Sequence, residues 1–518
     1  MEIDRRICDR ARRSRDARFD GKFFIAVTST RVYCRPICPA RSPKDENIRY
    51  YATAAAAQAA GFRPCLRCRP EASPGTPAWF GTSSVVSRAL RLIGDGALDR
   101  DDVDRLADRL GVTARHLRRL FVQHLGATPI EVALTRRVHF AKKLIDETPL
   151  PIAQVAFASG FGSIRRFNGE MRRTFSRTPT QLRKLSRKRE GSAEGYRFRL
   201  AYRPPYDWEH VIGFLAARAT PGVELVEGNR YRRTISIGDT AGTIAIGTAA
   251  DGPALLLEVQ LGDPRALLTI VERVRRMFDL GADPSVIEGQ LIADRLLRRI
   301  VAKHAGIRTP GAWDPFEITV RAILGQQISV KAATTIAGRL AARWGSPLGS
   351  SELRVKSDEQ RLSRLFPTPA QLADAPLEEA GITSARAATL RALARAVKDG
   401  IVVFEGVNAL DSLRAIPGIG EWTAQYVAMR ALNEPDAFPS GDLILRRMAG
   451  DCSARELERK SEAWRPWRAY AVMLLWQEQA ERSSGRQAAR EIRHAQVDLR
   501  RLGVGNRGGG AGDVVGAR

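Results

Sequence analysis

Four of the six cysteines are grouped in two close pairs. Three residues separate Cys34 from Cys38, two separate Cys65 from Cys68, and 26 residues lie between the pairs. This spacing is typical of a tetrahedral zinc site with four thiolate ligands. The surrounding segment, residues 1–70, is too short to bury a large core, so a bound metal would stabilise its fold. We therefore expect Zn²⁺ as a cofactor, and unliganded buried thiols are the alternative.

The same cysteines could also react. A zinc-bound thiolate stays deprotonated at neutral pH, and the thiolate is the nucleophilic form of cysteine. Arginines flank the cluster and would both offset its negative charge and attract a DNA backbone. They are Arg31, Arg35, Arg41, Arg63, Arg67 and Arg69. The residues alone leave open whether the site is reactive or purely structural.

A second group of candidate residues lies near the C-terminus. The motif PGIG at 417–420 separates two helical segments. Glycines at such a turn, here Gly418 and Gly420, let backbone N–H groups approach an anion such as a DNA phosphate. A plain turn between helices is the alternative. Further on, Asp442 precedes an apolar helical segment, where a lone aspartate is usually an N-cap.

Two helix-turn-helix patterns occur in residues 85–185. A helical segment at 103–110 is followed by Gly111 and by a second helix at 114–123, for which Thr113 is the expected N-cap. The pattern recurs at 152–158, with Ser163 capping the next helix. Both second helices are basic, which favours DNA binding over a merely solvated charged face. The candidate DNA contacts are Arg115, Arg118, Arg119, Arg165 and Arg166.

The elements that must position these residues divide the chain into several parts. Segments rich in Pro, Gly, Ser or charged residues predict linkers at 71–84 and 186–195, and a Gly-rich stretch predicts a flexible tail at 482–518. The folded regions that remain are 1–70, 85–185, 196–283 and 284–481.

Alternating apolar and polar residues predict strands in two of these regions. The first region has strand signals at 23–28 and 48–51, and the third has them at 196–200, 232–237, 243–248 and 255–261. After residue 284 the pattern is helical. We therefore expect a multidomain protein, mainly α with α+β parts: a small zinc domain, an all-α double helix-turn-helix, and a small antiparallel sheet followed by a helical body.

Charge and hydropathy narrow the function further. Lys and Arg number 83 against 57 Asp and Glu, a formal net charge of +26 on 518 residues, and apolar residues make up 44%. This balance suits a globular protein whose first partner is a polyanion, and DNA fits it best. No apolar run of about 18 residues is present, and the N-terminus lacks an apolar signal core. We expect a cytoplasmic, nucleoid-associated protein with no membrane partner.

The cysteine segment resembles a known family. FFIAVTSTRVYCRPICPAR and AGFRPCLRCRP, within residues 18–70, are similar to the N-terminal domain of the Ada family. In that family the first cysteine of the YCRPxC segment irreversibly accepts a methyl group from a methylphosphotriester in DNA. The resemblance assigns this role to Cys34. The Pro-Cys-His-Arg motif of the family's guanine-repair domain is absent from the sequence, so that activity is not expected.

The helical region that follows resembles another family. IAQVAFASGFGSIRRFNGEMRRTFSRTPTQLRK is similar to the signature of AraC-type regulators, in which both second helices enter the major groove. Together the two resemblances imply a methylation-sensing regulator that binds promoter DNA, with RNA polymerase as a candidate partner.

Residues from about 196 to 478 resemble the AlkA-type helix-hairpin-helix DNA glycosylases. The resemblance is carried by FEITVRAILGQQISVKAA, LRAIPGIGEWTAQYVAMR, PSGDLILRR and WRPWRAYAVMLLW. It implies excision of alkylated purines such as 3-methyladenine from double-stranded DNA. Asp442 takes the catalytic position, Trp422, Tyr426 and Trp476 match pocket aromatics, and Gln327 matches the residue that fills the gap left by the flipped base.

Trp422 also bears on the reaction type. Related glycosylases that cut the DNA strand carry a lysine here, which forms a Schiff base with the sugar, and tryptophan cannot. Cys452 alone cannot hold the iron–sulfur cluster that those lyases often carry. The resemblance therefore implies a monofunctional glycosylase. Two alternatives remain: a regulator whose glycosylase-like domain only binds DNA, and a glycosylase with a purely structural zinc domain.

Overall fold

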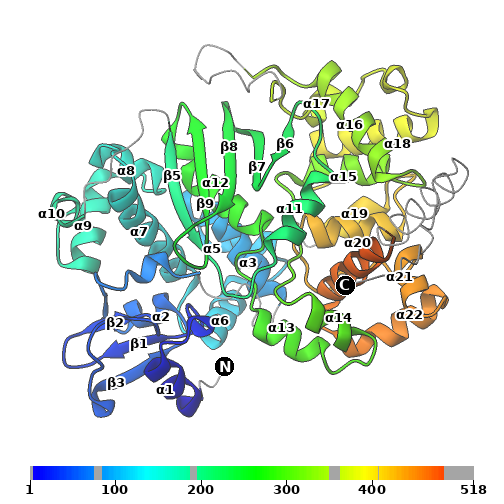
Figure 1. The fold of residues 1–518 in the computed structure, drawn as a ribbon. Helices are drawn as coiled ribbons and strands as arrows, with labels where there is room; N and C mark the ends of the chain where they lie inside the picture. The colour runs from blue at the N-terminus through cyan, green and yellow to red at the C-terminus, as the bar shows by residue number, and fades with distance from the viewer. Residues whose placement is uncertain (1–3, 75–83, 187–194, 349–361, 407, 484–518) are drawn as a thin grey trace, which may run out of the picture.

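The computed structural model describes residues 4–74, 84–186, 195–348, 362–406 and 408–483. The predicted linkers and tail lie mostly outside these residues. Within them, a small sheet, a group of helices, a second sheet and a larger helical body follow one another along the chain (Figure 1). This is the multidomain, mainly α architecture that the sequence predicts.

The N-terminal part is a small sheet flanked by two short helices. Its elements are α1 (Arg5–Ser14), β1 (Phe24–Val27), β2 (Val32–Cys34), β3 (Ile48–Tyr51), α2 (Ala54–Ala59) and β4 (Arg63–Pro64). The strand order is β3-β1-β2-β4, and β4 runs parallel to β2 while the other pairs are antiparallel. The strand signals at 23–28 and 48–51 are confirmed. The sequence did not indicate helix α1.

Helices alone form the next part of the chain. They are α3 (Ser84–Gly94), α4 (Ala97–Arg100), α5 (Val103–Arg109), α6 (Ala114–Leu125), α7 (Pro129–Glu147), α8 (Ile152–Ala158), α9 (Ile164–Phe175) and α10 (Pro179–Leu185). Both predicted second helices are confirmed as α6 and α9. Their predicted caps are also formed, because Thr113 and Ser163 accept hydrogen bonds from backbone N–H groups in the first turns.

The second sheet is antiparallel throughout. It contains β5 (Tyr196–Ala201), β6 (Glu224–Glu227), β7 (Arg230–Ile237), β8 (Thr240–Thr248) and β9 (Ala254–Leu261), in the order β5-β9-β8-β7-β6. Helix α11 (Trp208–Ala216) connects β5 to β6, and α12 (Leu267–Met277) follows β9. All four predicted strands of this region are confirmed, and β6 is an additional one.

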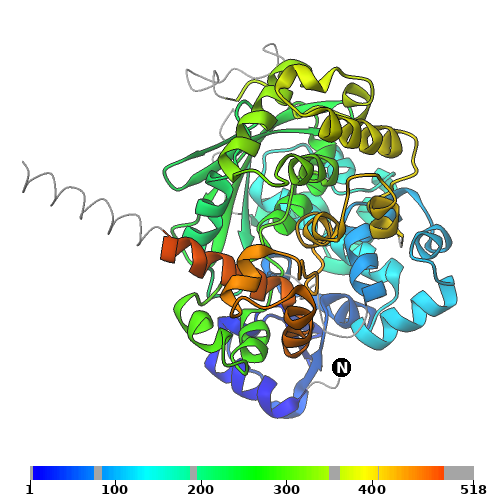
Figure 2. The same ribbon diagram turned by 90° about the vertical axis from the view of Figure 1, so that its right-hand side faces the viewer.

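The helical body follows from residue 284 onward. It contains α13 (Pro284–Leu291), α14 (Leu297–Lys303), α15 (Pro315–Leu324), α16 (Val330–Trp344), α17 (Pro369–Leu372), α18 (Ser384–Lys398), α19 (Ala409–Arg414), α20 (Glu421–Arg430), α21 (Leu443–Met448), α22 (Ala454–Ser461) and a final helix at 468–483. One apolar core joins α15, α16, α18 and α19, and another joins α13, α14 and the final helix. Figure 2 shows this helical body, coloured from green to orange-red, from a second side. Helix α20 contributes to both cores.

A single apolar core crosses from the helix-turn-helix part into the second sheet. Phe140 and Leu144 of α7 belong to the same buried cluster as Phe198 of β5 and Leu257 of β9. The rings of Phe140 and Phe198 lie 6.0 Å apart, and Lys143 donates a hydrogen bond to the carbonyl of Arg199. The two parts are therefore packed as one unit, with α7 beside β5 (Figure 1).

This shared core predicts that one substitution destabilises both parts. Phe198 is fully buried, so Phe198→Ala should cost about 3–5 kcal/mol of unfolding free energy. We expect amide hydrogen exchange to accelerate in α7 as well as in β5. Ile401→Ala, at an exposed position, is the control and should change neither. Unchanged protection of α7 in Phe198→Ala would mean that the two parts are stabilised independently.

Candidate functional site

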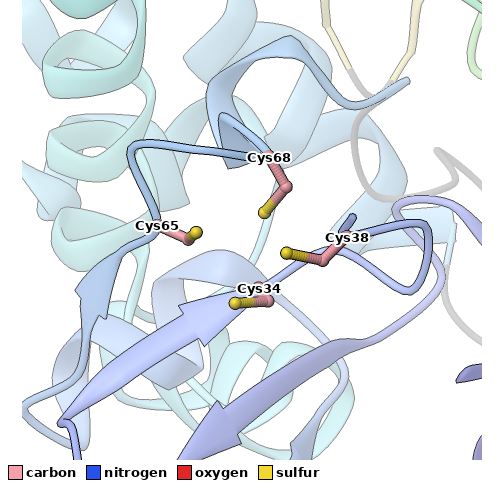
Figure 3. Close-up of side chains that lie close together, drawn as sticks. All are labelled: Cys34, Cys38, Cys65 and Cys68. Carbon is pink, nitrogen blue, oxygen red and sulfur yellow. The ribbon is translucent and has the colours of Figure 1, made fainter. Parts of the chain in front are cut away.

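The parallel pairing of β2 with β4 assembles the cysteine cluster. Cys34 ends β2 and Cys65 follows β4, and the Cys65 N–H donates to the carbonyl of Tyr33 at 2.9 Å. Cys38 and Cys68 lie in the turns that follow. The four Sγ atoms lie within 4.8 Å of one another and converge on a common centre (Figure 3). Four thiolates at such separations suit a tetrahedral zinc ion, whose Zn–S bonds are about 2.3 Å long.

Arg35 is bound to the cluster's own loops. Its backbone N–H donates to Sγ of Cys68 at 3.3 Å and its guanidinium to the Cys68 carbonyl at 3.1 Å. The same guanidinium forms a largely buried ion pair with Asp20, with Nε–Oδ1 at 2.9 Å. An N–H donor stabilises charge on a thiolate, so Arg35 supports the cluster. Since Asp20 neutralises its positive charge, Arg35 is less available for DNA than its sequence position suggested.

The cluster's sheet rests on helix α7, a contact that sequence reasoning missed. The Tyr33 hydroxyl lies 2.9 Å from Nε2 of His139, and the side-chain amide of Gln58 contacts both groups. Burial lowers the pKa of His139 to about 4. Beside the cluster, Arg69 forms an ion pair with Asp146 at 2.8 Å. These contacts connect the strand that carries Cys34 to the helix that joins the two helix-turn-helix units.

The five candidate DNA-contacting arginines lie on solvent-exposed faces of α6 and α9. Arg115, Arg118 and Arg119 project from α6, and Arg165 and Arg166 from the first turn of α9. None of them forms an ion pair with an acidic side chain among the described residues. Their charges are therefore available to an external anion.

Asp442 lies where three helices of the body meet. It caps α21: its Oδ1 accepts hydrogen bonds from the N–H groups of Ile444 at 2.9 Å and Leu445 at 3.0 Å. The indole N–H of Trp476 also donates to Oδ1 at 3.3 Å, and that of Trp422 donates to Oδ2 at 3.0 Å. Asp442 is thus an N-cap, as its sequence position suggests, and also the centre of a set of N–H donors.

The three predicted pocket aromatics are together beside this carboxylate. Trp422 and Tyr426, one turn apart on α20, stack with ring centroids 5.3 Å apart and planes at 11°. Tyr426 and Trp476 lie 6.3 Å apart at 42°. Residues from α20, α21 and the final helix therefore form one aromatic site with a single carboxylate.

Two arginines lie beside Tyr426, and both also contact the ring of Phe214; sequence reasoning missed all three. Arg430 donates to the Tyr426 hydroxyl at 2.8 Å, and the guanidinium of Arg218 lies 3.7 Å from the ring centroid of Phe214. Burial by itself would raise the pKa of Tyr426, but the charges of Arg430 and Arg218 outweigh it and lower that pKa. The only available signal was that Arg430 follows Tyr426 by one helical turn.

The hairpin before α20 requires glycine at one position. Gly418 has φ +92°, and a Cβ there would lie 2.2 Å from Oγ1 of Thr389. Gly420 is the extended N-cap of α20, with open space around it. The side chain of Gln326 donates to the Gly418 carbonyl at 3.0 Å and so holds the hairpin to the loop before α16. In that loop Gln327 is exposed, with a left-handed φ of 57°.

Family comparisons match the whole order of parts. Residues 7–71 match the metal binding domain of Ada, 106–185 a helix-turn-helix domain, 197–314 the AlkA N-terminal domain, and 320–467 the HhH-GPD superfamily of base excision DNA repair proteins. Together with the converging sulfurs, the first match identifies the four cysteines as a Zn²⁺ site. No helix among the described residues is long and apolar enough to cross a membrane.

Three relatives show how far the similarity extends. The chain is 44% identical, over 92% of its length and 97% of the relative's, to a probable bifunctional transcriptional activator/DNA repair enzyme AlkA of Mycobacterium tuberculosis (strain CDC 1551 / Oshkosh). It is 32% identical to DNA-3-methyladenine glycosylase 2 of Escherichia coli, over 54% of this chain and 96% of that one. It is 40% identical to the E. coli bifunctional transcriptional activator/DNA repair enzyme Ada, over 22% and 31% of the respective chains. The chain therefore belongs to the family of bifunctional transcriptional activator/DNA repair enzymes that join an Ada-type metal-binding domain and a helix-turn-helix domain to an AlkA-type glycosylase.

Proposed function

We propose that this protein excises alkylated purines such as 3-methyladenine from double-stranded DNA and regulates transcription when DNA is methylated. One observation carries the glycosylase assignment: Asp442 lies against Trp422 and Trp476, directly behind the hairpin that begins α20. Family membership supports the regulatory half, through the zinc and helix-turn-helix domains.

The chemistry needs one carboxylate. An N-alkylated purine already carries positive charge, so it leaves without a strong general acid. As the glycosidic bond breaks, the sugar approaches an oxocarbenium ion, which the Asp442 carboxylate stabilises. The lesion must first leave the duplex, at a cost of about a few kcal/mol. The faces of Trp422, Tyr426 and Trp476 attract a cationic base by about 0.5–2 kcal/mol over a neutral one.

DNA is held by several surfaces in this proposal. Gly418 and Gly420 bring backbone N–H groups close to a phosphate beside the lesion. Gln327, exposed in its loop, fills the gap that the flipped base leaves. The arginines of α6 and α9 contact promoter DNA in successive major-groove segments.

We assign methyl transfer to Cys34. Its thiolate sulfur attacks the methyl carbon of a methylphosphotriester, the methyl C–O bond breaks, and the phosphodiester anion leaves with the bonding electrons. The product is a neutral thioether, so the cysteine site becomes less negative and its attraction to DNA phosphates rises. The activated protein then binds promoters, with RNA polymerase as its partner, in a cytoplasmic, nucleoid-associated setting.

Base release and strand cleavage test the proposal together. Because the Trp422 side chain has no amine, the zinc-loaded full chain should release 3-methyladenine from methylated duplex DNA and leave the strand intact until alkali is added. Mass spectrometry identifies the released base, and gels run before and after alkali report cleavage. Strand nicks at neutral pH would contradict the monofunctional assignment. DNA binding without base release would favour the alternative of a domain that only binds DNA.

A further inference from the structure

A histidine and two glutamates meet at a point that neither proposed site uses. His304 follows α14, and Glu478 and Glu481 lie one turn apart on the final helix. Nε2 of His304 lies 3.5 Å from Oε2 of Glu478, and Nδ1 lies 3.8 Å from Oε1 of Glu481. One ligand atom from each of the three side chains can be chosen so that all lie within 4.8 Å of one another.

His304 is the unusual member of this cluster. Its side chain is only 6% exposed, and its buried Nε2, 3.5 Å from Oε2 of Glu478, makes no well-formed hydrogen bond among the described residues. Leaving a buried polar atom without a good hydrogen bond destabilises the folded protein. A ligand that accepts the lone pair of this nitrogen would remove that cost, so the burial of His304 itself points to a bound group.

We propose that His304, Glu478 and Glu481 form a binding site for a divalent transition-metal ion. One imidazole nitrogen with two carboxylate oxygens is a donor set that suits Zn²⁺ or Mn²⁺. The site differs from the cysteine cluster in ligand chemistry and in position.

Lys303 is the competing occupant. Its Nζ lies 2.9 Å from Oε2 of Glu478 and 2.5 Å from Oε2 of Glu481. The alternative to a metal site is thus an ion-pair network closed by this ammonium group. The Lys303 side chain is half exposed, so it can turn into water when an ion enters. An ion pair of this kind contributes little to stability, and a metal–ligand bond can replace it.

The location gives the bound ion a structural consequence. Glu478 lies two residues after Trp476 on the final helix, and the indole N–H of Trp476 donates to Asp442. Between them, Oε1 of Gln477 accepts a hydrogen bond from Nδ1 of His210 on α11 at 3.0 Å. A metal ion at Glu478 and Glu481 would fix the end of this helix to α14. The bound ion therefore supports the placement of Trp476 without touching the DNA.

Manganese titration tests the site in the full chain with its cysteine cluster loaded with Zn²⁺. Hard Mn²⁺ does not compete for four thiolates, so the decrease in the free Mn²⁺ electron paramagnetic resonance signal counts the second site. We expect one saturable equivalent in the unmodified protein. His304→Ala and Glu481→Gln should each weaken binding by about tenfold or more. Lys303→Ala should tighten it by about threefold, because the competing ammonium is removed.

The control is Glu462→Gln, an exposed carboxylate that pairs with Arg465 elsewhere on the body, and it should leave binding unchanged. Melting temperatures without Mn²⁺ identify any variant that fails to fold, and Glu481→Gln, at a partly exposed position, keeps the test usable if His304→Ala does fail. Two results would overturn the proposal: no saturable binding in either the unmodified protein or Lys303→Ala, or equal affinity in folded Glu481→Gln.

Discussion

Asp442→Asn should reduce the rate of alkylpurine release by about 10³-fold under single-turnover conditions. The substitution removes the negative charge that opposes the developing oxocarbenium ion, while its side-chain oxygen can still accept the backbone hydrogen bonds of Ile444 and Leu445. The α21 cap is therefore kept. The new amide N–H₂ instead faces the indole N–H of Trp422, and two donors cannot pair.

Single-turnover release of 3-methyladenine, with base identity read by mass spectrometry, checks this prediction. DNA affinity should stay close to that of the unmodified protein, because Asp442 carries no role in holding the duplex. Asp411→Asn is a matched control: Asp411 is a highly exposed carboxylate in the first turn of α19, and its loss should not alter release. A release rate for Asp442→Asn within a few-fold of that of the unmodified protein would contradict the catalytic assignment of Asp442.

The parts of the fold that the sequence predicted are those marked by local patterns, such as helix caps and alternating strand residues. Thr113 and Ser163 stand immediately before amphipathic basic segments, and both do cap helices. Strand alternation from 232 to 261 reports which side chains face the core, and the sheet forms there. These signals act within a few residues, so a single sequence contains them.

Helix α1 had no such signal. Its sequence is RRICDRARRS, with too few apolar residues for a recognisable stripe. The helix forms because Asp4 caps it and because Cys8 and Ala11 are buried against Phe23, Ile25 and Ile48. That packing surface is formed by residues that follow later in the chain, so no local sequence pattern indicates the helix.

The sequence also carried no signal for contacts between distant segments. Phe140 packs on Phe198, Tyr33 contacts His139, and Arg218 lies beside the ring of Phe214. The family resemblance named Asp442 and the aromatics but not these neighbours. Arg218, which lies just after α11, lowers the pKa of Tyr426 together with Arg430 of α20. The electrostatics of the aromatic site therefore depends on the tertiary fold as well as on the motif.

Methyl transfer should be lost entirely when Cys34 is replaced, even where the zinc ion remains. Cys34→His is the informative substitution, because sites with three cysteines and one histidine also bind zinc, whereas an imidazole ligand cannot form the S-methyl product. We expect near-normal zinc content in Cys34→His and no label on the protein after incubation with DNA that carries labelled methylphosphotriesters.

The controls separate a reactive thiolate from a structural one. Cys452→Ala and Cys8→Ala remove buried thiols outside the cluster and should leave transfer intact. Cys38→His tests the remaining question, since it also exchanges one ligand of the same zinc ion but keeps the proposed acceptor. Transfer should therefore survive in Cys38→His and fail in Cys34→His, with the label of the unmodified protein mapped by mass spectrometry to the peptide that contains Cys34. Label on the Cys34→His protein would place the methyl acceptor elsewhere, and Cys34 would then be only a structural zinc ligand. The comparison is decisive because histidine can replace a cysteine that merely holds the ion, whereas the methyl acceptor must be a thiolate.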